Sequence, residues 1–290
     1  MSALAPTRPA LGRPPASRRL RSGIQPVMTV VLTALVIGIP LWLVLVTSFK
    51  TTGEAQRPDL SLPDTWNAVA NYRQALSQGE VLQGFLGSLL VTVPTVVGLL
   101  LIGSAASWVL ARRGGRMIAV LYTLGISGII LPPAAITIVL TLRSLGLHRT
   151  LVGMIGVYMG IFMATVLFFI TGFIRTIPLE LEEAARIDGA SPRQVFLRII
   201  VPMLRPVIAT ATILVTLSVW NEVFFGFFVL GGGAVSTLPL NLYQVAAQSA
   251  YVNNWNLIFS YVVLMSLPML LLFAFAQKRI IAGITSGAVK

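Results

Sequence analysis

Few residues in this sequence are of the types that catalyse reactions or bind metal ions. Its 290 residues include nine acidic residues, one histidine and no cysteine, so disulfides and thiolate metal sites are excluded. His148 cannot build a metal site alone, and we expect it in a short polar connection. No G-x-x-x-x-G-K-[ST] segment occurs, and Gly231-Gly232-Gly233 lacks the lysine and the strand of a phosphate-binding loop. The sequence therefore predicts no metal site, no bound cofactor and no enzymatic catalysis within this chain.

The elements that position the polar residues are long apolar segments. Hydrophobic residues make up 56% of the chain and charged residues only 10%, against about 25% charge in a soluble domain. Runs of about 20 apolar residues are long enough to cross a bilayer as helices. We predict an all-α integral membrane protein with six transmembrane helices, at 26–49, 85–110, 117–142, 151–174, 206–230 and 257–276.

The positive charges indicate the orientation of these helices. Lys and Arg number 21, and most of them lie before the first span, in the second and fourth connections and after the last span. Because positive residues stay on the cytoplasmic side of a plasma membrane, both termini are predicted to be cytoplasmic. The excess of positive over negative residues is explained by this topology and does not indicate nucleic acid as a partner. We expect a disordered basic tail at 1–22, a transmembrane domain at 23–276 and a cytoplasmic tail at 277–290.

The fourth connection, 176–203, reads as two short helices. The first begins near Pro178, has three glutamates in its first turn and ends at Gly189 as a C-terminal cap. Ser191 and Gln194 form the pattern of a capping box that starts the second helix, and Pro202 ends it. The apolar face of the second helix must be buried against its own bundle, the lipid interface or another protein.

A family resemblance favours the third of these possibilities. Glu183-Ala184-Ala185, followed by Gly189, Ile199, Val201 and Pro202, resembles the E-A-A-x(3)-G-x(9)-I-x-L-P loop of bacterial ABC importer permeases. Val201 replaces the usual leucine, which is a conservative change. The segments 183–190, 220–222, 237–240 and 283–290 are similar to the maltose-type, carbohydrate branch of this family.

The resemblance implies how such a chain works. The loop would dock into a separate ATPase subunit, which binds ATP and Mg, and closure of the ATPase dimer would move the spans as a body. The implied partners are a sister permease in a heterodimer, two ATPase subunits, an extracytoplasmic solute-binding protein and membrane lipid. Gly189→Asp or Glu183→Lys should then uncouple transport without preventing insertion. The implied coupling residues are Glu183, Ala184, Ala185, Asp188, Gly189, Ile199 and Pro202.

Glu222 is the carboxylate expected at membrane depth. A charged group at this depth costs free energy unless it faces water, the protein interior or a partner. In a transport pathway its oxygens could bind a sugar hydroxyl beside Asn221, while Trp220 or Tyr122 stacks on the sugar ring. The alternative is a structural hydrogen bond.

The connection 231–256 has no charged residue but many amides and aromatic residues. By resemblance it faces the solute-binding protein, although a solvated polar loop is the alternative. Two other functions are alternatives for the chain: an ion-coupled secondary transporter, and a membrane enzyme or scaffold. A secondary transporter would need intramembrane charges, and only Glu222 is available. An enzyme would need convergent catalytic residues, which the sequence does not show. The residues of this connection that could contact the receptor are Gln244, Gln248, Asn253 and Asn254.

Overall fold

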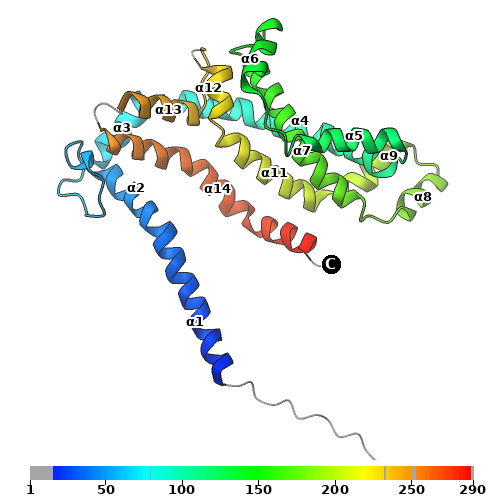
Figure 1. The fold of residues 1–290 in the computed structure, drawn as a ribbon, viewed down its shortest axis with the longest axis horizontal. Coiled ribbons are helices and arrows are strands. Elements are labelled where there is room, and N and C mark those ends of the chain that lie inside the picture. Colours follow the sequence, from blue (N-terminus) through cyan, green and yellow to red (C-terminus); the bar gives the residue numbers. More distant parts are fainter. Residues whose placement is uncertain (1–15, 79, 232, 250–252, 289–290) are drawn as a thin grey trace, which may run out of the picture.

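The protein is described by a computed structural model that covers residues 16–78, 80–231, 233–249 and 253–288. Every regular element in these ranges is a helix (Figure 1), which confirms the all-α fold. The longest bundle helices are α4 (Val81–Arg112), α7 (Leu151–Ile174) and α14 (Trp255–Ala288). The pair formed by α4 and α7 has the most extensive contact, and α11 (Arg205–Trp220) packs against α4, α7 and α14.

Four of the six predicted spans are single helices of suitable length and composition. They are Gln25–Phe49, Val81–Arg112, Leu151–Ile174 and Trp255–Phe275, and the third of these has the bounds predicted from sequence. The last helix continues to Ala288, beyond the apolar span that ends at Phe275, so the tail predicted at 277–290 begins within this helix. The side chains beyond residue 277 lie outside the described part of the chain.

The prediction of a single third span at 117–142 is wrong. The structure has two shorter helices instead, α5 (Arg116–Ser127) and α6 (Ala135–Ser144). Pro132 and Pro133 lie in the non-helical segment between them, because a proline inside a helix removes a hydrogen bond and clashes with the preceding turn.

The predicted fifth span, 206–230, is also interrupted. It divides into α11 and α12 (Phe224–Leu230), with a break at 221–223. At its other end, α11 meets the segment Pro192–Met203 at an angle of 71°. Counting this bent pair as one span, the described residues contain up to five helical spans, and the predicted number of six is not confirmed.

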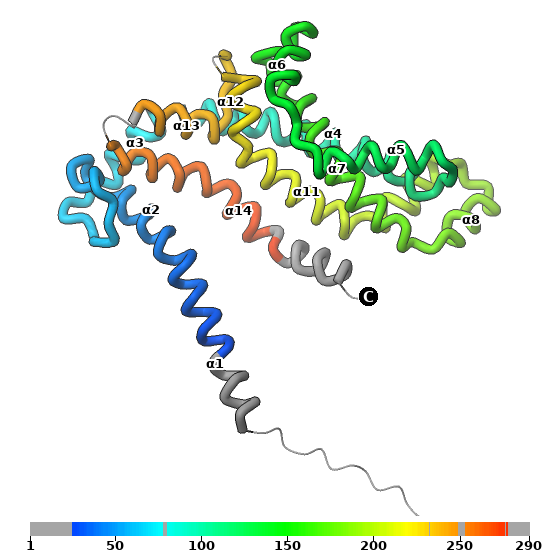
Figure 2. Tube along the Cα trace, viewed as in Figure 1, coloured from blue at the N-terminus to red at the C-terminus, as the bar shows by residue number. Residues whose placement is uncertain are grey.

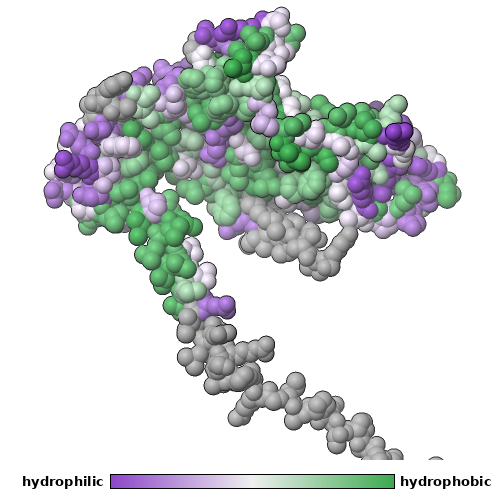
Figure 3. Space-filling model, viewed as in Figure 1, coloured by the Kyte–Doolittle hydropathy of each residue, from purple (hydrophilic) through white to green (hydrophobic). Residues whose placement is uncertain are grey.

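The first span stands apart from the bundle. It is continuous through α1 (Ala16–Thr33), the π-helix η1 (Ala34–Gly38) and α2 (Ile39–Phe49), so helix begins within the tail predicted to be disordered, whose residues 1–15 lie outside the description. Only 6% of its most apolar window is buried, and it projects from the bundle in Figure 2. Figure 3 shows its hydrophobic surface, which is available to lipid or to another subunit.

A polar joint ties the end of α2 to the starts of α3 (Ala68–Gln78) and α14. The buried amide of Asn71 donates to the carbonyls of Ser48 and Lys50 at 2.9 and 2.8 Å, and its oxygen accepts from Asn256 at 3.0 Å. The buried Lys50 ammonium also pairs with Asp59. Hydrogen bonds from Lys50 and from Ser61 lower the pKa of Asp59 from 3.8 to about 2. The stability that they add is therefore present above about pH 4 and is lost as the pH falls through 2.

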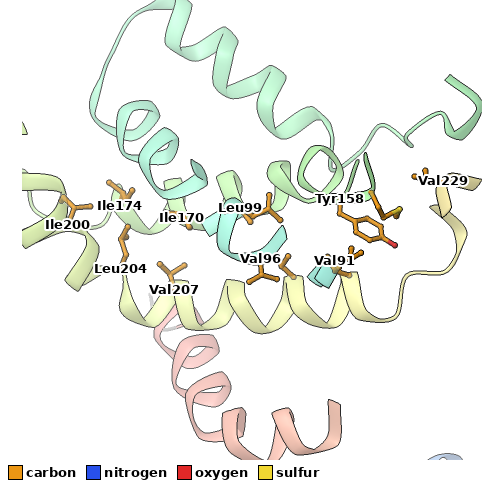
Figure 4. Packing of buried hydrophobic residues seen from close by; sticks show 14 of the residues in the cluster. Val91, Val96, Leu99, Tyr158, Ile170, Ile174, Ile200, Leu204, Val207 and Val229 are labelled. Atoms are coloured by element: carbon orange, nitrogen blue, oxygen red, sulfur yellow. The ribbon is translucent and has the colours of Figure 1, made fainter. Parts of the chain in front are cut away.

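The main core runs along the length of the bundle. In Figure 4, Ile200, Leu204 and Ile174 lie at one end, Leu99 and the other labelled residues continue the row, and Tyr158 and Val229 lie at the other end. All of these side chains are buried in one cluster. Because close-packed interiors deform little, a displacement of one end should be carried toward the other. The remaining labelled residues are Val91, Val96, Ile170 and Val207.

Candidate functional site

The first helix of the fourth connection is α8 (Glu180–Ile187). Gly189 follows it with a left-handed φ of 84°, which glycine adopts without the penalty of a Cβ. Its N–H donates to the Arg186 carbonyl at 3.0 Å, and the Ala190 N–H donates to the Ala185 carbonyl at 2.9 Å. These two hydrogen bonds form a Schellman motif, so the predicted cap at Gly189 is confirmed.

The second half of the connection begins with the predicted capping box. The Gln194 N–H donates to the Ser191 hydroxyl at 3.4 Å, and the Ser191 N–H donates to the Gln194 side chain at 2.8 Å. The helical path continues through α9 (Pro192–Val195), the π-helix η3 (Phe196–Ile200) and α10 (Val201–Met203). The path ends at Met203, one residue after Pro202, which is the end predicted from the sequence.

The predicted coupling residues do not form a single surface. Glu183, Ala184, Asp188 and Gly189 are exposed. Ala185 and Ile199 are half-buried and pack against the main core, and Pro202 is also half-buried. The motif therefore contains an outward set that could contact another protein and an inward set that attaches the loop to the bundle.

The outward surface of α8 includes apolar residues that the motif did not indicate. Ile187 is 85% exposed and Leu181 is 44% exposed. With Ala184 they repeat every three residues, so they share a face of the helix. An exposed apolar stripe beside carboxylates is suited to docking against another protein. The three-residue spacing is visible in the sequence and could have identified this stripe.

The sequence analysis also did not separate Glu182 from its neighbours. Glu182 is 0% exposed, and its carboxylate accepts hydrogen bonds from Arg112 Nε at 2.6 Å and from Trp108 Nε1 at 3.0 Å. Both donors lie in the last turns of α4, about 70 residues earlier in the chain. Their four-residue spacing places both donors on one face of α4, but it does not indicate which glutamate they contact.

Glu222 makes structural hydrogen bonds at the break between α11 and α12. One carboxylate oxygen accepts from the Phe225 N–H at 2.9 Å. The other accepts from the Gly226 N–H at 3.1 Å and the Tyr158 hydroxyl at 2.6 Å. The carboxylate thus satisfies amides in the first turn of α12, where the helix dipole favours negative charge. This geometry favours the structural role over direct contact with a substrate.

The other residues of the predicted pathway are separated. Trp220 is 3% exposed and packs edge-on against Phe85, whereas Asn221 is exposed. The ring of Tyr122 lies 4.6 Å from the Arg175 guanidinium, at the end of α7 nearest the fourth connection. At 1.5 Å per residue, Arg175 is about 25 Å along α7 from Tyr158, which contacts Glu222. Tyr122 and Glu222 therefore cannot contact one small substrate molecule together.

We expect Glu222→Gln to lower the amount of correctly assembled protein, because glutamine offers one acceptor oxygen to three donors. Uptake per assembled molecule should remain within about twofold of the original, with an unchanged KM, since a structural interaction is made equally with and without substrate. Transport kinetics normalised to purified complex check this. A changed KM in normally assembled protein would instead place Glu222 in the pathway.

The predicted receptor-facing loop is partly a helix. Gln244 and Gln248 are exposed one turn apart on α13 (Leu238–Ser249). Asn253 is exposed with φ 53°, and the Asn254 carbonyl accepts from the N–H groups of Leu257 and Ile258 at 3.1 Å. Residues 250–252, between these pairs, lie outside the described part of the chain.

The remaining polar residues form no metal site in the part of the chain that the structure describes. His148 is half-buried in the connection after α6, and its ring nitrogen lies 3.3 Å from the Phe228 carbonyl oxygen. This position agrees with the expected polar connection.

Comparisons with known proteins place this geometry in a family. Residues 98–286 match the model of the binding-protein-dependent transport system inner membrane component family. The melibiose/raffinose/stachyose import permease protein MelC of Bacillus subtilis is 33% identical over 87% of this chain and 91% of its own length. The multiple sugar-binding transport system permease protein MsmG of Streptococcus mutans is 33% identical over 88% of this chain and 93% of its own length.

A solved structure supports the fold. A chain of a bacterial ABC transporter involved in the import of the acidic polysaccharide alginate has a TM-score of 0.76. The match covers 92% of this chain and 99% of that chain at 20% identity. From the family match and the relatives, we conclude that this chain belongs to the binding-protein-dependent transport system inner membrane components, which are permease subunits of ABC importers.

Proposed function

We propose that this chain is the permease subunit of an importer for a sugar or sugar derivative, driven by ATP that separate subunits hydrolyse. The observation that carries this proposal is the position of α8, whose outward residues are exposed while its buried Glu182 binds Arg112 of the bundle. The relatives named for raffinose-type sugars and multiple sugars support a carbohydrate substrate.

The outward set of α8 is the proposed ATPase contact. Its exposed Glu183 can pair with a basic side chain of the ATPase, and Ile187 and Ala184 supply the apolar part of the interface. Ala185 and Ile199 pack against the core and hold the loop to it. ATP and Mg would bind the partner ATPase, whose closure would move the attached helices.

The proposed assembly has α8 and both termini in the cytoplasm and α13 on the outer side, where Gln244 and Gln248 face a solute-binding protein. A sister permease completes a heterodimer, and each permease docks one ATPase subunit. Because Glu222 is occupied by structural hydrogen bonds, we retain exposed Asn221 as the pathway residue and place Tyr122 at the cytoplasmic end.

Reconstitution in proteoliposomes tests the function. We expect a labelled oligosaccharide to accumulate only when the sister permease, the ATPase, internal ATP and the external receptor are all present. Uptake driven by a proton gradient without ATP would contradict the proposal and support an ion-coupled transporter. A binding screen on the receptor then identifies which sugar is carried.

A further inference from the structure

The most completely buried charged group near the fourth connection is the carboxylate of Glu182. Both of its oxygens are used: Oε1 accepts from Arg112 Nε at 2.6 Å, and Oε2 accepts from Trp108 Nε1 at 3.0 Å. Arg186, one turn along α8, lies 3.6 Å from Oε2. Arg112 also donates to the Ile177 carbonyl at 2.8 Å, so it holds the segment that enters α8 as well as α8 itself.

Trp108 connects the two halves of the fourth connection. Its indole N–H binds Glu182 on α8, and its ring lies against Phe196 of η3 with centroids 5.3 Å apart. One side chain of α4 therefore contacts both the helix that carries the outward residues and the helix that leads to α11. We name Trp108, Arg112 and Glu182 the α4–α8 joint.

The helix that carries this joint reaches the opposite end of the bundle. At 1.5 Å per residue, the 32 residues of α4 span about 48 Å. Near its start, the Ser88 hydroxyl accepts the Leu238 N–H at 2.9 Å, at the beginning of α13. A rotation of α4 at Arg112 would therefore displace the start of α13, which is bonded to Ser88.

We propose that the α4–α8 joint makes α4 follow the motion of α8, with Glu182 as the positioning residue that transmits the ATPase movement. The proposal deepens the proposed function and rests on it. A buried ion pair is a poor source of net stability but has a strict geometry. Two directional hydrogen bonds to a carboxylate fix the angle between the helices, whereas apolar contacts alone would allow them to slide.

Neighbouring glutamates on α8 provide a matched test in the reconstituted importer. Glu182→Gln leaves the outward face intact, so the ATPase should co-purify in the original ratio, while sugar transported per ATP hydrolysed falls on the order of tenfold. Glu183→Gln should instead weaken ATPase co-purification, while the complexes that do form should transport the original amount of sugar per ATP hydrolysed. Asp64→Asn, at an exposed loop position outside both sites, should change neither quantity.

Trp108→Phe is the second variant if Glu182→Gln does not assemble. It removes one donor but keeps an aromatic ring against Phe196, and we expect the transport per ATP to fall about threefold. Unchanged transport per ATP in an assembled Glu182→Gln or Trp108→Phe complex would overturn the joint. Failure of the original chain to bind an ATPase would instead overturn the proposed function.

Discussion

Glu183→Lys is expected to reduce uptake about a hundredfold, because it places a positive charge where we propose that a basic ATPase residue binds. The carboxylate is exposed and has no hydrogen bond or ion pair within the described residues. The substitution should therefore leave membrane insertion and the amount of protein unchanged. Uptake in vesicles, with protein quantified in the membrane fraction, measures the effect.

Asp64→Lys supplies the matched control for Glu183→Lys. It makes the same change of charge at an exposed position in the loop between α2 and α3, far along the bundle from α8. Uptake should stay close to the original. Equal uptake by the two variants, at the original level, would remove Glu183 from the ATPase contact.

Gly87→Ala is expected to have the largest effect on stability. A Cβ at this position would overlap the carbonyl oxygen of Ser236, which is backbone and cannot rotate away. The neighbouring Gly84 has a similar constraint, since its Cβ would lie 2.7 Å from the amide nitrogen of Asn241. The segment leading into α13 would have to move, which costs about 3 kcal/mol. Stimulation of ATP hydrolysis by the receptor should fall as α13 shifts.

Thermal unfolding of the purified protein in detergent checks this prediction. We expect the midpoint of Gly87→Ala to be about 5 °C or more below the original. Gly172→Ala is the control, because a Cβ on this α7 glycine meets nothing within 4 Å and alanine favours helix by up to about 1 kcal/mol. A Gly87→Ala midpoint at or above that of the original protein would contradict the close packing of α4 on this segment.

The parts of the fold that local chemistry determines could be predicted from the sequence. The bounds of α7 follow from one uninterrupted apolar run. The Schellman motif at Gly189 and the capping box at Ser191 need only residues within one or two turns. For the same reason, the predicted division of the fourth connection into two short helical segments is confirmed.

Contacts between distant residues could not be predicted in this way. Three glutamates in one helical turn look alike in the sequence, and only the packing of Trp108 and Arg112 makes Glu182 the buried one. Glu222 likewise obtains its role from Tyr158 on another helix. The third span is divided at Pro132 and Pro133, and the apolar residues on both sides of these prolines make the sequence resemble one continuous span.

Crosslinking from α8 tests the central claim most directly, and the absence of native cysteine makes single-cysteine labelling specific. Ile187→Cys, at an exposed position, should crosslink to the ATPase subunit and be labelled only from the cytoplasmic side. Gln244→Cys on α13 should be labelled from outside and crosslink to the solute-binding protein. If Ile187→Cys is labelled from outside, or never crosslinks to a subunit that hydrolyses ATP, the account of α8 as the coupling helix is contradicted.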